Sequence, residues 1–185
     1  MKLSINWLKD YISLNKSVDE IADSLTMIGN EVEEIMTTGD IPGVIVAEIK
    51  EIIPHPNADK LQLTKIYDGK NTLSVVCGAP NIKEGQKIFL ATIGTNLPDP
   101  NNNSYFEIKK SKIRGELSEG MICSEKELGI SEDHEGIMVL PNDYELGTSI
   151  SNYYAETILD IDVTPNRVDC LSVVGLARDL SAKFS

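Results

Sequence analysis

The sequence predicts an α+β fold in which a small closed β barrel is inserted into a small, discontinuous helical domain. The middle of the chain, residues 39–151, contains short β-rich segments punctuated by glycine, proline and asparagine. The flanks, residues 1–38 and 152–185, carry helical patterns, and each is too short to bury a core alone. Packing the two flanks together removes that difficulty, since insertions are tolerated where their ends lie close together.

The first flank predicts two helices. Ile5, Leu8 and Ile12 have the spacing of one face of a short helix. Ser17 and Glu20 then form a capping box that starts a second helix. Its apolar face consists of Val18, Ile21, Leu25 and Ile28. Gly29 suits the position that ends this helix, and residues 31–35 predict a short extended segment.

The middle zone predicts five or six strands. The β-rich segments are residues 44–52, 61–67, 72–77, 87–93, 105–108 and 137–140. Asp68 and Gly69 supply a tight turn between the second and the third. Short strands at this density predict a small closed barrel rather than an open sheet.

The last flank predicts one strand followed by one helix. Residues 158–163 alternate as a strand, and residues 164–167 form a turn. The closing helix has one apolar face, formed by Val173, Leu176, Ala177 and Leu180. Asp169 or Ser172 can cap its start.

Composition and charge restrict the possible functions. The chain has 185 residues and a net charge of −12, which argues against a dedicated nucleic-acid binder because phosphate contacts need Lys and Arg. A polyanion site must therefore be a local basic patch.

The three cysteines are far apart in sequence, which predicts no disulfide framework and favours the cytoplasm. We expect neither a signal peptide nor a membrane span, because no long apolar run occurs.

Four stretches of the middle zone resemble the tRNA-binding OB domain of several tRNA ligases and free-standing tRNA-binding proteins. They are PHPNADKL at 54–61, VCGAPN at 76–81, KIRG at 112–115, and SEGMICSEKELG at 118–129. The second and fourth, in these versions, are similar to the β subunits of bacterial phenylalanine–tRNA ligases. The flanks agree with the same family through MKLSINWL at 1–8, GNEVE at 29–33, DVTPNRVDC at 162–170 and GLAR at 175–178.

The resemblance implies an OB-type barrel within the N-terminal portion of a ligase β subunit. It further implies ATP, magnesium, phenylalanine and its tRNA as ligands of the whole ligase, with two α and two β subunits assembled. The catalytic residues of that family lie elsewhere, so we expect this chain to contain no catalytic site and no cofactor of its own.

The densest basic run is the first candidate tRNA-binding site. On a strand, alternation would place Lys110, Lys112 and Arg114 on one face, where three cations can follow a nucleic-acid backbone. The alternative is that these charges protect an edge strand from aggregation.

Lys60, Ser118 and one of two aromatic residues are further candidates outside this run. Lys60 would face a phosphate at the mouth of the barrel, or be a solvated lysine in a structural turn. Ser118 would bond either the backbone or a phosphate. One of Tyr105 and Phe106 could stack on a base, while the other would pack in the core.

Metal binding and catalysis have no clear pattern in the sequence. His55, Cys77, Cys123 and His134 lack the short spacings that structural zinc sites use, so we predict no metal site. No nucleophile–base pair or phosphate-binding loop stands out. The leading hypothesis is accessory tRNA binding and subunit architecture in the ligase. The alternatives are a purely structural, protein-interaction module without RNA contact and, disfavoured by the flanks, a free-standing tRNA-binding protein.

Overall fold

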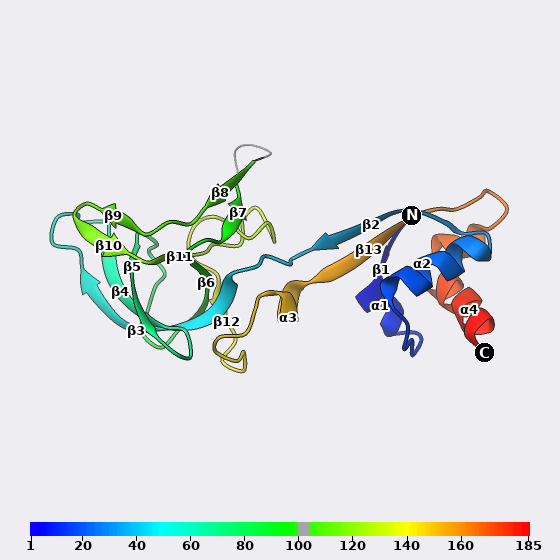
Figure 1. Ribbon diagram of the computed structural model, residues 1–185, viewed down its shortest axis with the longest axis horizontal. Coiled ribbons are helices and arrows are strands. Elements are labelled where there is room, and N and C mark those ends of the chain that lie inside the picture. The colour runs from blue at the N-terminus through cyan, green and yellow to red at the C-terminus, as the bar shows by residue number, and fades with distance from the viewer. Residues whose placement is uncertain (100–103) are drawn as a thin grey trace. The chain divides into compact units, whose positions relative to one another are not determined.

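The computed structural model describes residues 1–99 and 104–185, and these form two compact units (Figure 1). We call Met1–Thr38 with Ala155–Ser185 the base unit, and Gly39–Tyr154 the barrel unit. The barrel unit ends at Tyr154, whereas the sequence placed the end of the middle zone at Ser151. The difference is helix α3 (Ser151–Tyr154), which belongs to the barrel unit. No helix in the described residues is long and apolar enough to cross a membrane.

The base unit contains a sheet as well as helices, so the expected helical domain is corrected to a mixed α/β unit. Its three antiparallel strands have the order β1-β13-β2, where β1 is Lys2–Ser4, β13 is Glu156–Asp162 and β2 is Glu31–Thr38. The physical reason is burial. Leu3 and Leu159 pair across the sheet and are fully buried, giving the short helices an apolar surface to cover.

Three α-helices and one short 3₁₀ helix complete the base unit. They are α1 (Ile5–Lys9), α2 (Val18–Met27), η1 (Val168–Leu171) and α4 (Val173–Phe184). In Figure 1 the α-helices all lie below β2 and β13. Their buried residues form one core with the sheet, which includes Leu8, Ile21, Leu25, Leu159, Leu176 and Leu180.

The helix ends confirm the capping predicted from the sequence. Ser17 Oγ accepts the Glu20 amide at 3.2 Å, and the Glu20 carboxylate accepts the Ser17 amide at 3.0 Å. Gly29 follows α2 with a φ of 94°, the left-handed conformation that glycine adopts without steric cost. Ser172, one of the two predicted caps, accepts the Gly175 amide at the start of α4.

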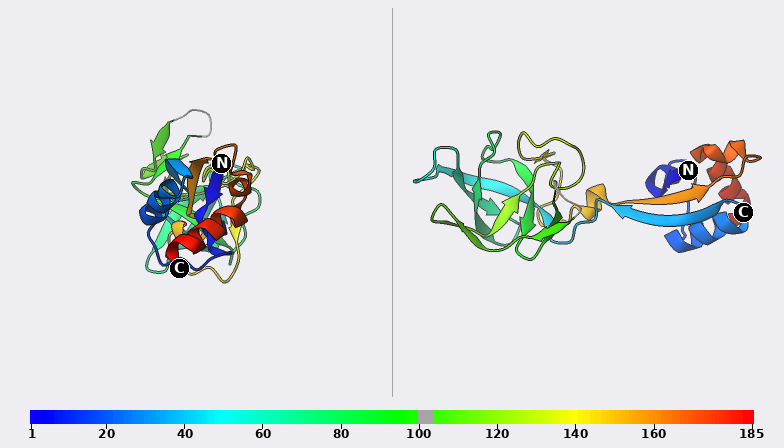
Figure 2. Two further views of the ribbon diagram at one scale, coloured as in Figure 1. Left: turned by 90° about the vertical axis from the view of Figure 1, so that its right-hand side faces the viewer. Right: turned by 90° about the horizontal axis from the view of Figure 1, so that it is seen from above.

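The barrel unit is built around one strongly curved antiparallel sheet (Figure 2). Its strand order is β11-β6-β3-β4-β5, with β12 (Val139–Leu140) also paired to β6. The strands are β3 (Val44–Pro54), β4 (Gln62–Tyr67), β5 (Thr72–Cys77), β6 (Lys87–Thr92) and β11 (Gly120–Ile122). Two hairpins extend from it: β7 (Asn96–Pro98) with β8 (Tyr105–Glu107), and β9 (Ser111–Ile113) with β10 (Glu116–Ser118).

The two edges of the curved sheet meet, so the sheet is a nearly closed barrel. The Glu119 amide, just before β11, donates to the Ser74 carbonyl of β5 at 2.8 Å. The interior of the barrel is filled by one apolar core, which includes Ile49, Ile66, Val75, Leu90 and Ile122. Successive side chains of a strand point to opposite faces, so Val46 and Phe89 belong to a second core on the other face of the sheet. Strand β10 ends at Ser118, directly before this edge-to-edge contact.

The two ends of the barrel unit lie side by side. Gly39 has a φ of 69°, and a side-chain Cβ there would be 2.0 Å from the Tyr154 carbonyl oxygen. Only glycine allows this close approach. Within the base unit, Thr38 pairs with Glu156, so the outgoing and returning segments are adjacent strands. This is the geometry that an inserted unit requires.

Candidate nucleic-acid interface

The β9–β10 hairpin presents the basic residues on a tight turn. Ile113 pairs with Glu116, so the loop consists of Arg114 and Gly115 alone. Their φ angles, 52° and 99°, are both positive, as a type I′ turn requires. Arg114 is the one non-glycine residue with positive φ among the described residues. Asn or Gly is the usual choice at such a position, because the left-handed conformation costs other residues about 1–2 kcal/mol.

Two of the three predicted cations are free to meet a ligand. In the described residues, Lys112 and Arg114 are exposed and have no ion-pair partner. Lys110 differs, because its Nζ lies 2.8 Å from Glu119, and this hydrogen bond lowers the pKa of the Glu119 carboxyl. β9 ends at Ile113, so Arg114 lies in the turn instead of on the strand face that alternation predicted.

The loop of residues 55–61, which carries Lys60, is fastened to this hairpin by His55. The imidazole is 6% exposed; its Nδ1 accepts the Asn57 amide at 3.1 Å, and its Nε2 lies 3.2 Å from the Ile113 carbonyl. An amide can only donate and a carbonyl can only accept, so the ring is the tautomer that carries its proton on Nε2. The bond to Ile113 therefore joins the loop to the residue before Arg114.

A second contact places the same loop at the tip of the hairpin. The Asn57 side-chain nitrogen is 4.0 Å from the position of a Cβ on Gly115. Lys60 is exposed on this loop. The structure thus brings the Lys60 loop and the Arg114 turn together, although the two are far apart in sequence.

Ser118 is buried and does not belong to the exposed interface. The side chain is 3% exposed, accepts the Val76 amide of β5 at 3.2 Å and donates to the Gly120 carbonyl at 3.0 Å. Its hydroxyl bonds the backbone, the first of the two roles expected for it. Ser118 therefore closes the barrel and has no free group for a phosphate.

The two aromatic candidates on β8 have opposite environments. Tyr105 is 74% exposed, whereas Phe106 is half-buried and packs against the apolar core that contains Val46 and Phe89. An exposed aromatic ring is a surface on which a base can stack. Of the pair, only Tyr105 can take that role.

Two of the sequence motifs line a cleft of about 600 Å³. Residues 76–80 form one side, and Met121, Glu127 and His134 contribute to the rest. Buried Cys77 and Cys123 belong to these motifs, and burial raises the pKa of both thiols, so they stay protonated. Protonated thiols are poor nucleophiles and poor metal ligands.

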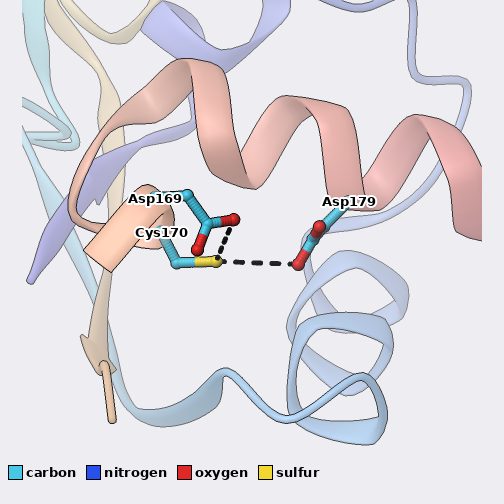
Figure 3. Close-up of side chains that lie close together, drawn as sticks. All are labelled: Asp169, Cys170 and Asp179. Carbon is cyan, nitrogen blue, oxygen red and sulfur yellow. Dashed lines mark hydrogen bonds between the residues drawn. The ribbon is translucent and has the colours of Figure 1, made fainter. Parts of the chain in front are cut away.

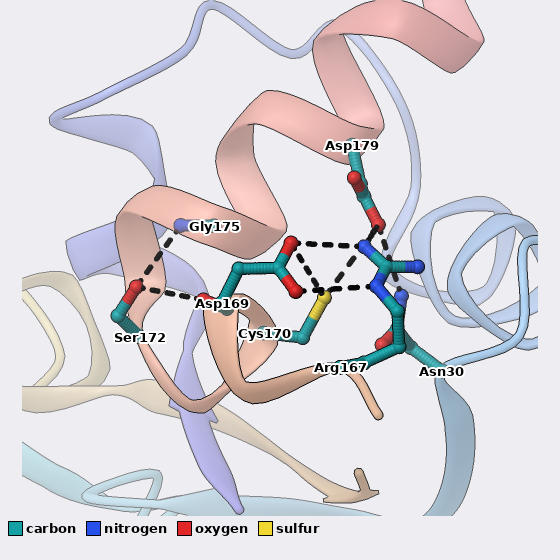
Figure 4. Close-up of polar contacts among 7 residues, drawn as sticks. All are labelled: Asn30, Arg167, Asp169, Cys170, Ser172, Gly175 and Asp179. Carbon is teal, nitrogen blue, oxygen red and sulfur yellow. Dashed lines mark hydrogen bonds and ion pairs between the residues drawn. The ribbon is translucent and has the colours of Figure 1, made fainter. Parts of the chain in front are cut away.

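The base unit contains one group of potential metal ligands in the described part of the chain. Asp169, Cys170 and Asp179 place ligand atoms within 4.8 Å of one another (Figure 3). The Arg167 guanidinium lies between the two carboxylates, at 3.1 Å from Asp169 and 2.5 Å from Asp179 (Figure 4). A guanidinium already fills the place that a cation would take.

The protonation behaviour of this network agrees with an ion-pair role. Hydrogen bonds to Asp169 and Asp179 raise the pKa of Arg167, and the same guanidinium lowers the pKa of Asp169. Burial, reinforced by Asp179, raises the pKa of the Cys170 thiol to about 11. The Asn30 side chain adds a donor to Asp179 at 3.3 Å. The network joins the start of β2, η1 and α4, and we assign it a structural role.

A nearly closed barrel whose edge hairpin and adjoining loop present unpaired cations has the features of the OB-type barrels that bind nucleic acids. The sequence family described as "Putative tRNA binding domain" matches residues 44–149, and the chain belongs to this family. The match coincides with the barrel unit and includes Lys60, Lys112 and Arg114.

The wider similarity is to phenylalanine–tRNA ligase β subunits. The chain is 49% identical to that of Geobacter metallireducens over 187 aligned residues, 47% to that of Syntrophus aciditrophicus and 45% to that of Fusobacterium nucleatum. These alignments cover 98–100% of the chain but only 22–23% of the relatives. Among solved structures, a Naegleria gruberi RNA ligase mutant aligns with a TM-score of 0.44, 14% identity, and coverage of 62% of this chain and 34% of that one, which carries no inference.

Proposed function

We propose that the chain is an accessory tRNA-binding portion of a phenylalanine–tRNA ligase β subunit, with its barrel unit acting as an OB-type module. The barrel holds the tRNA body through phosphate contacts from Lys60, Lys112 and Arg114, and does not read its sequence. The match to a tRNA-binding family and the similarity to ligase β subunits support the proposal.

One observation carries it: Arg114 occupies a left-handed turn position in spite of its conformational cost. A residue held in an unfavourable conformation points to a role that compensates for the cost. Here the role is to display a guanidinium, which binds phosphate in a bidentate fashion, at the outermost point of the hairpin.

The net charge of −12 predicts that this binding is weak and salt-sensitive. With so few free cations on an acidic body, the contacts steer and hold a tRNA that other parts of the ligase recognise. ATP, magnesium, the α subunit and the assembly of two α and two β subunits belong to the whole ligase, which we place in the cytoplasm. We assign no step of its chemistry to this chain.

A structural, protein-interaction role without RNA contact is the second candidate. The acidic surface favours it, because like charge repels a phosphate backbone. The cleft that residues 76–80 line also fits it, since its rim includes the carboxylates of Glu127 and Glu135.

A titration of tRNA at low salt separates the two candidates. The parent chain is compared with Lys112→Gln/Arg114→Asn, and with Lys70→Gln/Arg178→Gln as a control of equal charge change at exposed positions that do not belong to the hairpin. Binding that weakens severalfold in the hairpin variant alone supports tRNA contact. No binding by the parent chain, or equal weakening in both variants, supports the structural role instead.

A further inference from the structure

We propose that His55 is a positioning residue that locks the loop of residues 55–61 and the β9–β10 hairpin into one preformed, phosphate-facing surface. The inference rests on the proposed function for its purpose, but its geometry stands apart from tRNA. His55 itself is buried, so it acts by holding other residues in place.

The bond from His55 Nε2 to the Ile113 carbonyl, at 3.2 Å, links the two segments directly. The hairpin is short: three residues in each strand and two in the turn. An isolated two-stranded hairpin is marginally stable in water, so its tip needs a tertiary anchor. The carbonyl that accepts the bond belongs to Ile113, the residue immediately before Arg114. Fixing this peptide limits the directions in which the Arg114 side chain can leave the turn.

The other ring nitrogen fixes the loop side of the lock. Nδ1 accepts the Asn57 amide, while the His55 amide donates to the Leu61 carbonyl at 3.1 Å. These two bonds hold the loop that carries Lys60 against His55. One imidazole therefore orders both basic segments, and preordering reduces the entropy lost when they bind a ligand.

Two substitutions separate the two halves of the lock. A glutamine amide nitrogen extends about as far as Nε2, so His55→Gln retains a donor for Ile113. An asparagine amide oxygen ends about where Nδ1 does, so His55→Asn retains the acceptor for the Asn57 amide. It loses the donor to the Ile113 carbonyl of the hairpin. The matched control is His134→Asn, which changes the exposed histidine of the chain.

The experiment measures tRNA affinity at low salt together with amide hydrogen exchange of residues 112–116. We expect His55→Asn to bind about 3- to 10-fold more weakly and to exchange faster in the hairpin, with His55→Gln near the parent. The proposal would be overturned if the two variants had equal tRNA affinity and equal hairpin exchange rates. It would also be overturned if His55→Asn matched the parent in both measurements.

Two further readouts keep the test decisive. Nitrogen NMR of the unmodified chain must show Nδ1 bare and Nε2 protonated, and the opposite tautomer overturns the proposal even if a variant fails to fold. If the parent chain binds no tRNA, the proposed function fails, yet the exchange difference between the two variants still decides whether His55 holds the hairpin.

Discussion

The Ser118 hydroxyl accepts the Val76 amide at 3.2 Å and so ties β10 to β5 where the edges of the barrel meet. Ser118→Ala leaves this buried amide without a partner, and we expect it to cost about 1–3 kcal/mol of unfolding free energy. Urea unfolding followed by circular dichroism measures the loss. Ser111, its exposed cross-strand neighbour, is the matched control, and Ser111→Ala should stay within about 0.5 kcal/mol of the parent. If folded Ser118→Ala bound tRNA more weakly than the parent, Ser118 would belong to the binding interface after all.

Arg114 predicts a conflict between stability and binding. Asn tolerates the left-handed conformation better, so Arg114→Asn should stabilise the barrel unit by about 0.5–1 kcal/mol while weakening tRNA binding severalfold. Urea unfolding and tRNA titration measure the two effects on the same sample. Arg178→Gln, at an exposed position on α4, controls for the loss of one positive charge and should change neither. A variant that is more stable and binds equally well would show that Arg114 has no part in binding.

The Arg167–Asp169 pair predicts a pH dependence of the base unit. The pKa of Asp169 is lower in the folded chain than in the unfolded chain, so unfolding takes up a proton between the two values. The stabilisation is therefore complete above the unfolded pKa of about 3.9 and is lost as pH falls through the folded value. Arg167→Gln removes the pair, so the difference between parent and variant should be constant from pH 7 to 5 and shrink near pH 3.

Fluorescence of Trp7, the one tryptophan of the chain, reports unfolding of the base unit in this experiment. Arg178→Gln is again the control, and its difference from the parent should not depend on pH. A difference for Arg167→Gln that persists undiminished at pH 3 would mean that the guanidinium acts through packing and not through charge.

Gly175 tests the packing of α4 against η1, the 3₁₀ helix before it. A Cβ at this position would lie 1.9 Å from the Asp169 carbonyl oxygen. Gly175→Ala should therefore destabilise the base unit by at least about 2 kcal/mol, although Ala is the better helix former by about 1 kcal/mol. Val174→Ala, at the exposed neighbouring position, is the control. A gain in stability for Gly175→Ala, followed by Trp7 fluorescence, would contradict the packing.

The sequence predicted the elements whose signals are local. Residues 72–77 were predicted as a β-rich strand and form β5 over that very range, and the capping box at Ser17 starts α2. β1 was missed because three residues before a helix carry no periodic pattern. The glutamate-rich β2 is stabilised by pairing with β13, a partner distant in sequence. Such long-range pairing is invisible to a local pattern.

The candidate site was predicted only in outline. The basic run was identified from its charge, but a two-residue turn at Arg114 was not, because Arg is an unusual residue for positive φ. Ser118 could not be placed without knowing that β5 passes beside it. From the sequence, His55 was considered only as a possible metal ligand, because its bond to Ile113 joins residues that are distant in sequence.

The salt dependence of tRNA binding tests the central claim most directly. Each phosphate contact that a cation makes adds about one unit to the slope of log affinity against log salt. The claim predicts that Lys112→Gln/Arg114→Asn lowers this slope by about two units relative to the parent, whichever tRNA is used. An unchanged slope and affinity in the double variant would contradict it, because the hairpin would then make no contact with the phosphate backbone.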